Sequence, residues 1–86
     1  MTAFYVTHEV DGDECVMFHR DSFQEAERAL RAEAEHNRDA VLCIYGTGPA
    51  YPSGVALLAM WNGRGQRLTL TRAGTAAIQR QEPIGT

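Results

Sequence analysis

Lysine is absent from this 86-residue sequence, and so are several features that would place it in a familiar class at once. No apolar run approaches the ~18 residues that a membrane-spanning helix requires. The start of the chain, "MTAFYVTHEV", has neither the basic residues nor the apolar core of a signal peptide. These absences predict a cytoplasmic protein that does not associate with membranes.

Cysteine is scarce, and only Cys15 and Cys43 are present. Two cysteines are too few for a disulfide framework in so short a chain. Each lies in an apolar run, "CVMF" or "VLCIY", so we expect two buried free thiols. Together with His8 and His19 they match no zinc-ligand spacing, so we expect no metal and no cofactor.

The glycine-rich stretch 45–54, "YGTGPAYPSG", lacks the elements of a phosphate-binding loop. Tyr51 stands where a dinucleotide fingerprint needs its third glycine, and an apolar strand pattern follows instead of a helix. Ser53 has no nucleophile-elbow motif around it. Bulky apolar neighbours flank both thiols, which argues against an accessible Cys–His pair. The sequence therefore predicts a protein that is not an enzyme.

The first twenty residues have the pattern of a β-hairpin. Apolar and polar residues alternate over 3–10, "DGD" at 11–13 has the composition of a turn, and 14–20 form the returning strand. A two-residue turn would place His8 opposite Cys15, whereas a three-residue turn would shift that pairing. The sequence leaves both registers open.

Residues 21–39, "DSFQEAERALRAEAEHNRD", predict a helix that ends near Asn37. Ser22 and Glu25 have capping-box spacing, and the interior is rich in good helix formers. Glu27 and Arg31 form an i,i+4 pair in the favourable order. One helix face carries a mostly small apolar stripe that can lie close to a sheet: Phe23, Ala26, Leu30 and Ala34.

The second half of the chain predicts three more strands. Residues 39–46 and 54–62 are apolar on both faces, which is typical of central strands with both faces covered. The Asn-Gly turn at 62–65 leads into 66–72, where the alternation of a half-buried strand returns. Residues 73–86 form either a short helix or a loose tail.

The predicted fold is therefore α+β in the order ββαβββ, a single small domain over residues 1–86. One helix packs on one face of a mostly antiparallel five-stranded sheet. Because the strand at 54–62 also presents apolar side chains to the second face, something must cover that face. The C-terminal segment and a second subunit are the two candidates, and the latter predicts a homodimer.

Two features predict contacts with a partner rather than chemistry. Pro49 and Pro52 stiffen the 45–54 loop and place Tyr51 at its crest. Tyr51 is then either an interface anchor or a side chain that folds back onto the sheet. Trp61, just before the Asn-Gly turn, is a second candidate anchor.

Charge is divided unevenly along the chain. Residues 1–46 hold ten acidic residues and four arginines, whereas residues 47–86 hold four arginines and one acidic residue. We expect either a solvated surface or an acidic surface for a basic partner, such as a protein groove that normally holds nucleic acid. The candidate partner-binding acids lie in the hairpin turn and on the helix: Asp11, Asp13, Glu14, Glu25 and Glu35.

An alternative is that the chain itself binds nucleic acid. Arg64, Arg67 and Arg72 would form a basic patch with Trp61 on the last hairpin. The sequence pI of about 5.5 argues against direct binding of nucleic acid.

The stretches "AFYVTHEV…ECVMFHRDSFQEAERAL" and "LLAMWNGRGQRLTL" give the chain a resemblance to a known group. Over residues 3–72 it resembles small phage-encoded anti-CRISPR proteins that bind type I surveillance complexes. It differs in its acidic helix and its longer proline-containing loop. The resemblance implies a non-enzymatic inhibitor in the host cytoplasm that binds an effector complex and blocks its nucleic-acid-binding surface. The alternatives are a dimeric accessory domain and a small nucleic-acid-binding protein.

Overall fold

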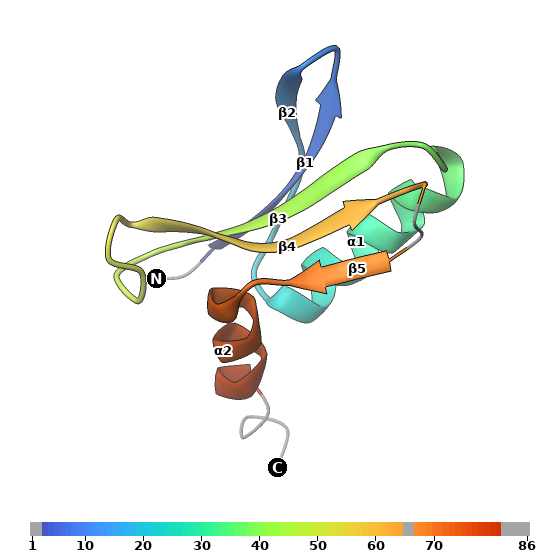
Figure 1. The fold of residues 1–86 in the computed structure, drawn as a ribbon. Coiled ribbons are helices and arrows are strands. Elements are labelled where there is room, and N and C mark those ends of the chain that lie inside the picture. Colours follow the sequence, from blue (N-terminus) through green and yellow to red (C-terminus); the bar gives the residue numbers. More distant parts are fainter. Residues whose placement is uncertain (1–2, 65–66, 82–86) are drawn as a thin grey trace.

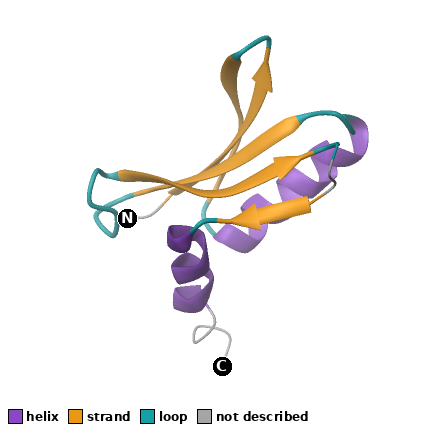
Figure 2. Cartoon of the chain, viewed as in Figure 1, coloured by secondary structure: helices purple, strands orange, loops and turns teal. Residues whose placement is uncertain are grey.

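A computed structural model describes residues 3–64 and 67–81 of the chain. Five antiparallel strands form one sheet in the order β2-β1-β3-β4-β5, and two helices accompany it (Figures 1 and 2). The predicted α+β fold and its meander of three final strands are confirmed. The elements in chain order are β1 (Ala3–Val10), β2 (Asp13–Arg20), α1 (Phe23–His36), β3 (Val41–Thr47), β4 (Val55–Asn62), β5 (Arg67–Leu70) and α2 (Arg72–Gln81).

The β1–β2 hairpin has a two-residue turn. Asp11 and Gly12 both have positive φ, 52° and 87°. A two-residue turn whose twist matches that of its strands requires positive φ at both positions. The turn places His8 opposite Cys15, which settles the register that the sequence left open. Further along β2, Met17 is an extra residue in a β-bulge, which bends this edge strand and makes it a poorer template for another strand.

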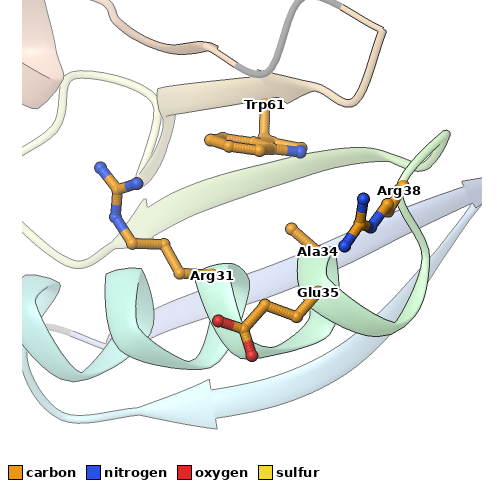
Figure 3. A pocket seen from close by; sticks show the side chains of 5 residues that line it. All are labelled: Arg31, Ala34, Glu35, Arg38 and Trp61. Carbon is orange, nitrogen blue, oxygen red and sulfur yellow. The ribbon is translucent and has the colours of Figure 1, made fainter.

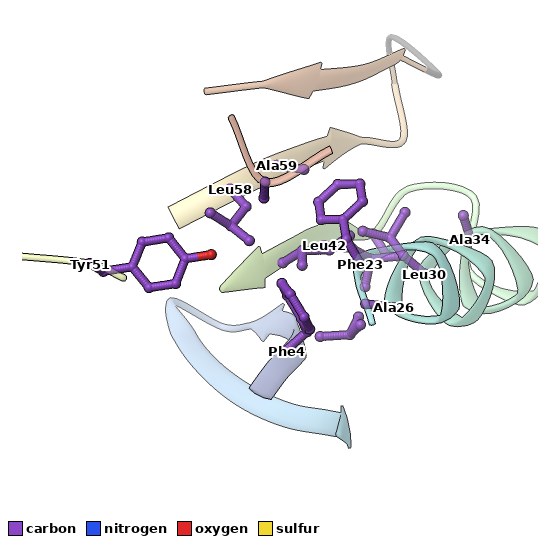
Figure 4. Packing of buried hydrophobic residues seen from close by; sticks show 13 residues of the cluster. Phe4, Phe23, Ala26, Leu30, Ala34, Leu42, Tyr51, Leu58 and Ala59 are labelled. Atoms are coloured by element: carbon purple, nitrogen blue, oxygen red, sulfur yellow. The ribbon is translucent and has the colours of Figure 1, made fainter. Parts of the chain in front are cut away.

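Helix α1 begins and ends where the sequence predicts. The Ser22 side chain accepts a hydrogen bond from the backbone N–H of Glu25 at 3.1 Å. At the other end, the backbone N–H of Asn37 donates to the carbonyl of Glu33 at 3.0 Å. The predicted stripe lies against the sheet, and each of its side chains is buried (Figure 4): Phe23, Ala26, Leu30 and Ala34.

Both helices cover the same face of the sheet (Figure 1). Ala77 of α2 belongs to the hydrophobic core that Leu30 of α1 shares with Ile44 of β3 and Leu58 of β4. Gly74 brings α2 close to β4, because a Cβ at this position would lie 2.0 Å from the carbonyl oxygen of Leu58. The expectation that the C-terminal segment could cover the second face is therefore wrong for the described residues.

The loop between β3 and β4 does not present Tyr51 to solvent. Only 5% of Tyr51 is exposed, and Figure 4 shows its ring directed into the core. Gly46 makes room for it, since a Cβ on Gly46 would lie 2.6 Å from the Tyr51 hydroxyl oxygen. The prediction of Tyr51 as an exposed anchor is wrong, and the alternative, in which its side chain folds back onto the sheet, is correct.

The two thiols differ in burial. Cys43 on the central strand β3 is 7% exposed, whereas Cys15 on the edge strand β2 is exposed. The expectation that Cys15 is buried is wrong because this end of the hairpin extends away from α1, so no second layer covers it (Figure 1).

The close approach of α2 to β4 predicts an unusual response to Gly74→Ala. In a helix interior this change normally stabilises by about 1 kcal/mol. Here we expect a loss of about 1–3 kcal/mol in the free energy of unfolding, because the new Cβ collides with the Leu58 carbonyl. Urea denaturation followed by circular dichroism measures this difference, with Gln79→Ala at an exposed position of α2 as the control. A Gly74→Ala protein more stable than wild type would contradict the packing.

Candidate functional site

The sheet face turned away from both helices is covered by no other described element. Side chains alternate along each strand, so the residues between the core positions point to this face. Strand pairing arranges them in four levels across the sheet. We call this surface the open face. Its first level consists of Glu14, Glu9, Val41, Asn62 and Arg67, and its second level of Val16, Thr7, Cys43, Met60 and Thr69. Its third level consists of His19, Tyr5, Tyr45 and Leu57, and its fourth level of Ala3, Thr47 and Val55.

Much of the open face is apolar and accessible. Val16, Met60 and Val55 are 63%, 44% and 49% exposed. The rings of Tyr5 and His19 lie 5.0 Å apart beside them, on β1 and β2. The sequence led us to expect that both faces of β4 are covered, and the exposure of Met60 and Val55 contradicts this. An apolar surface of this kind on a small domain is typical of an interaction site.

A carboxylate is fixed within the open face. The Thr7 hydroxyl donates to Glu14 Oε2 at 2.8 Å, and the Tyr45 hydroxyl lies 3.0 Å from both carboxylate oxygens, so it donates to the same group. The one ion pair among the described residues joins Arg31 to Glu27, so Glu14 has no cationic partner there. The arrangement holds a negative charge at a defined place and leaves it unneutralised.

Tyr45 and Cys43, which both lie near the Glu14 carboxylate, resist ionisation. Burial raises the pKa of Tyr45 to about 12, and the hydrogen bond to Glu14 adds to the effect. Burial, followed by the charge of Glu14, raises the pKa of the Cys43 thiol. A thiol in this environment is a poor nucleophile.

The five predicted acidic residues do not form a single cluster. Asp11 and Asp13 are at the hairpin turn, which projects away from the helices (Figure 1). Glu25 is in the first turn of α1 and Glu35 in the last, about 15 Å apart along the axis. Arginines interrupt the acids of the helix, as in the shallow surface depression lined by Gln24, Glu27, Arg28 and Arg31. Of the five predicted acids, only Glu14 belongs to the open face.

The predicted basic patch around Trp61 is divided between the two faces. Trp61 pairs with Leu68 on the helix-covered side, whereas Arg67 points to the open face. Arg64 lies in the turn, and Arg72 begins α2. The basic side chains near Trp61 come instead from α1 and from the residues just after it.

A hollow of about 340 Å³ lies beside Trp61 and is bordered by Arg31, Glu35 and Arg38 (Figure 3). The Arg31 guanidinium carbon is 5.9 Å from the centre of the Trp61 ring, a cation–π distance. Sequence reasoning did not select Arg31 and Arg38 as site residues. Arg31 lies on α1 and Arg38 follows its C-cap residue Asn37, so helical spacing alone does not bring the two together.

Searches of protein-family models, curated proteins and solved structures found no match to this chain. Within the described residues, no helix is long and apolar enough to cross a membrane. The same residues contain no group of three His, Cys, Asp or Glu side chains that could share a metal ion.

The raised pKa of Tyr45 predicts a loss of stability in base. Between pH 10 and about 12 the unfolded chain releases the Tyr45 proton while the folded chain retains it, so the free energy of unfolding falls as the pH rises. Tyr45→Phe should lose this part of the decline, although removal of the hydroxyl also changes stability at neutral pH. Urea denaturation at pH 9 and pH 11.5 measures the fall in the free energy of unfolding for each of the two proteins. Equal declines in both proteins would contradict the assignment.

Proposed function

We propose that this protein is a non-enzymatic protein-binding module whose binding surface is the open face. The observation that carries the proposal is the exposure of Val16, Met60 and Val55 on a sheet face that no described residue covers. Aromatic residues and methionine are enriched at protein interfaces, and lysine is depleted. The open face contains Tyr5, Tyr45 and Met60, and the chain has no lysine.

The polar groups of the open face add specificity to this apolar area. Glu14 is held by Thr7 and Tyr45, so a partner meets the carboxylate in one position and loses little entropy in binding it. An apolar partner surface would leave that charge buried and unpaired, which is costly. The preferred partner therefore brings a cation to Glu14 and apolar side chains to its neighbours.

The resemblance to anti-CRISPR proteins supplies a definite partner class for this module. Under this proposal the protein inhibits a type I surveillance complex by occupying a surface that the nucleic acid needs. The separation of Asp11, Glu25 and Glu35 favours steric obstruction over mimicry of a nucleic-acid charge pattern.

A gel-shift assay with a purified type I surveillance complex and its DNA target tests this function. The wild-type protein should co-elute with the complex and prevent the DNA shift. Met60→Glu places a charge in the open face and should lose both effects. Ala32→Glu adds the same charge at an exposed position of α1 and should retain them. An unchanged DNA shift with no co-elution would refute this partner class, and equal inhibition by both variants would refute the open face as the binding surface.

A further inference from the structure

We infer that the partner of the open face is a second copy of this chain, packed face to face in a two-fold symmetric sandwich. This inference rests on the proposed binding role of the open face and names its occupant in the free protein, which a surveillance complex would have to displace. It follows from the placement of charge, shape and apolar side chains on that face.

The symmetry of the open face determines how two copies can meet. A two-fold axis that runs between the sheets and parallel to the strands reverses the strand order and preserves the level along the strands. β2 of one copy then lies over β5 of the other, β1 over β4, and β3 over β3. Sheets packed in this way keep their strands within about 30° of each other. Each level of one copy therefore faces the same level of the other.

Opposite charges meet under this symmetry. Glu9 and Glu14 occupy the β1–β2 end of the first level, and Arg67 occupies its β5 end. In the sandwich, Arg67 of each copy approaches the two carboxylates of the other copy. Neither Glu14 nor Arg67 has an ion-pair partner among the described residues, so the contact supplies a partner to both. The symmetry forms this contact twice.

The shapes of the two ends also match. Val16, 63% exposed on β2, projects at the second level. At the β5 end, a hollow of about 520 Å³ spans the first and second levels and is bordered by Val41, Met60, Trp61, Asn62, Arg67 and Thr69. The two-fold axis places Val16 of one copy over this hollow in the other. The projection and the hollow would therefore bury each other's apolar atoms.

The size of the open face is sufficient for a stable dimer. Four strands of seven or eight residues and one strand of four, spaced about 4.8 Å apart with a rise of about 3.3 Å per residue, cover roughly 500–600 Å² of flat area. Projecting side chains such as Val16, Met60 and Tyr45 increase the accessible area beyond this. The result is close to the roughly 800 Å² that each partner contributes to a standard interface.

Charge reversal with sedimentation equilibrium tests the sandwich. The wild type should sediment as a dimer, with twice the 9.5 kDa mass of the chain. Glu14→Arg and Arg67→Glu should each weaken dimerisation by roughly tenfold to a hundredfold, because each places like charges together. The double variant restores opposite charges and should return to near wild-type affinity. Arg64→Glu makes the same charge change in the turn, outside the open face, and should leave the dimer unchanged.

Circular dichroism of each variant checks that it folds. If Glu14→Arg unfolds because it loses Thr7 and Tyr45, Thr69→Glu provides an independent test, since it adds a carboxylate at an exposed position of the contact and should also weaken the dimer. A monomeric wild type would overturn the sandwich while leaving the proposed binding of another protein intact. A dimer that is indifferent to both Arg67→Glu and Thr69→Glu would overturn the sandwich together with the role of the open face in self-association.

Discussion

Close packing of both helices against one face of the sheet is the constraint on which the rest of this structure depends. The small residues Ala26 and Ala34 bring α1 near the sheet, and Gly74 lets α2 approach the backbone of Leu58. The apolar residues of β1, β3 and β4 on that side are consequently buried. No described element remains for the other side of the same strands, so their alternate side chains stay accessible.

The open face resembles a protein interior that lacks a second layer to cover it. Apolar side chains and tyrosines surround a carboxylate whose hydroxyl partners fix its position but do not neutralise it. A buried charge is tolerated when an opposite charge meets it, and this explains why a partner that carries a cation suits the face. Arg67 at the far end of the same level gives the chain such a cation of its own. The face is thus complementary to itself under a two-fold rotation, whereas the dispersed acids elsewhere define no comparable surface.

Local interactions were predictable from the sequence, and long-range ones were not. The Ser22 cap, the presence of a turn at 11–13 and the buried stripe on α1 depend on neighbours within a few residues, and the structure confirms them. The side on which α2 packs and the slot that Gly46 provides for Tyr51 depend on contacts between distant segments. The Glu14 cluster joins residues of three strands, so it became visible only once the strand register was known. Of the candidate site residues, Glu14 and Arg67 lie on the open face. Sequence reasoning had assigned them to two different candidate sites.

The central claim is that the open face is covered in solution. Methyl NMR with a soluble paramagnetic agent tests it directly, because Met60 on the open face and Val10 at the hairpin turn are 44% and 47% exposed in the single chain. Covering of the open face predicts that the Met60 methyl signal is shielded from the agent at high protein concentration while the Val10 signals are broadened. Equal broadening of both, at every concentration, would contradict the account.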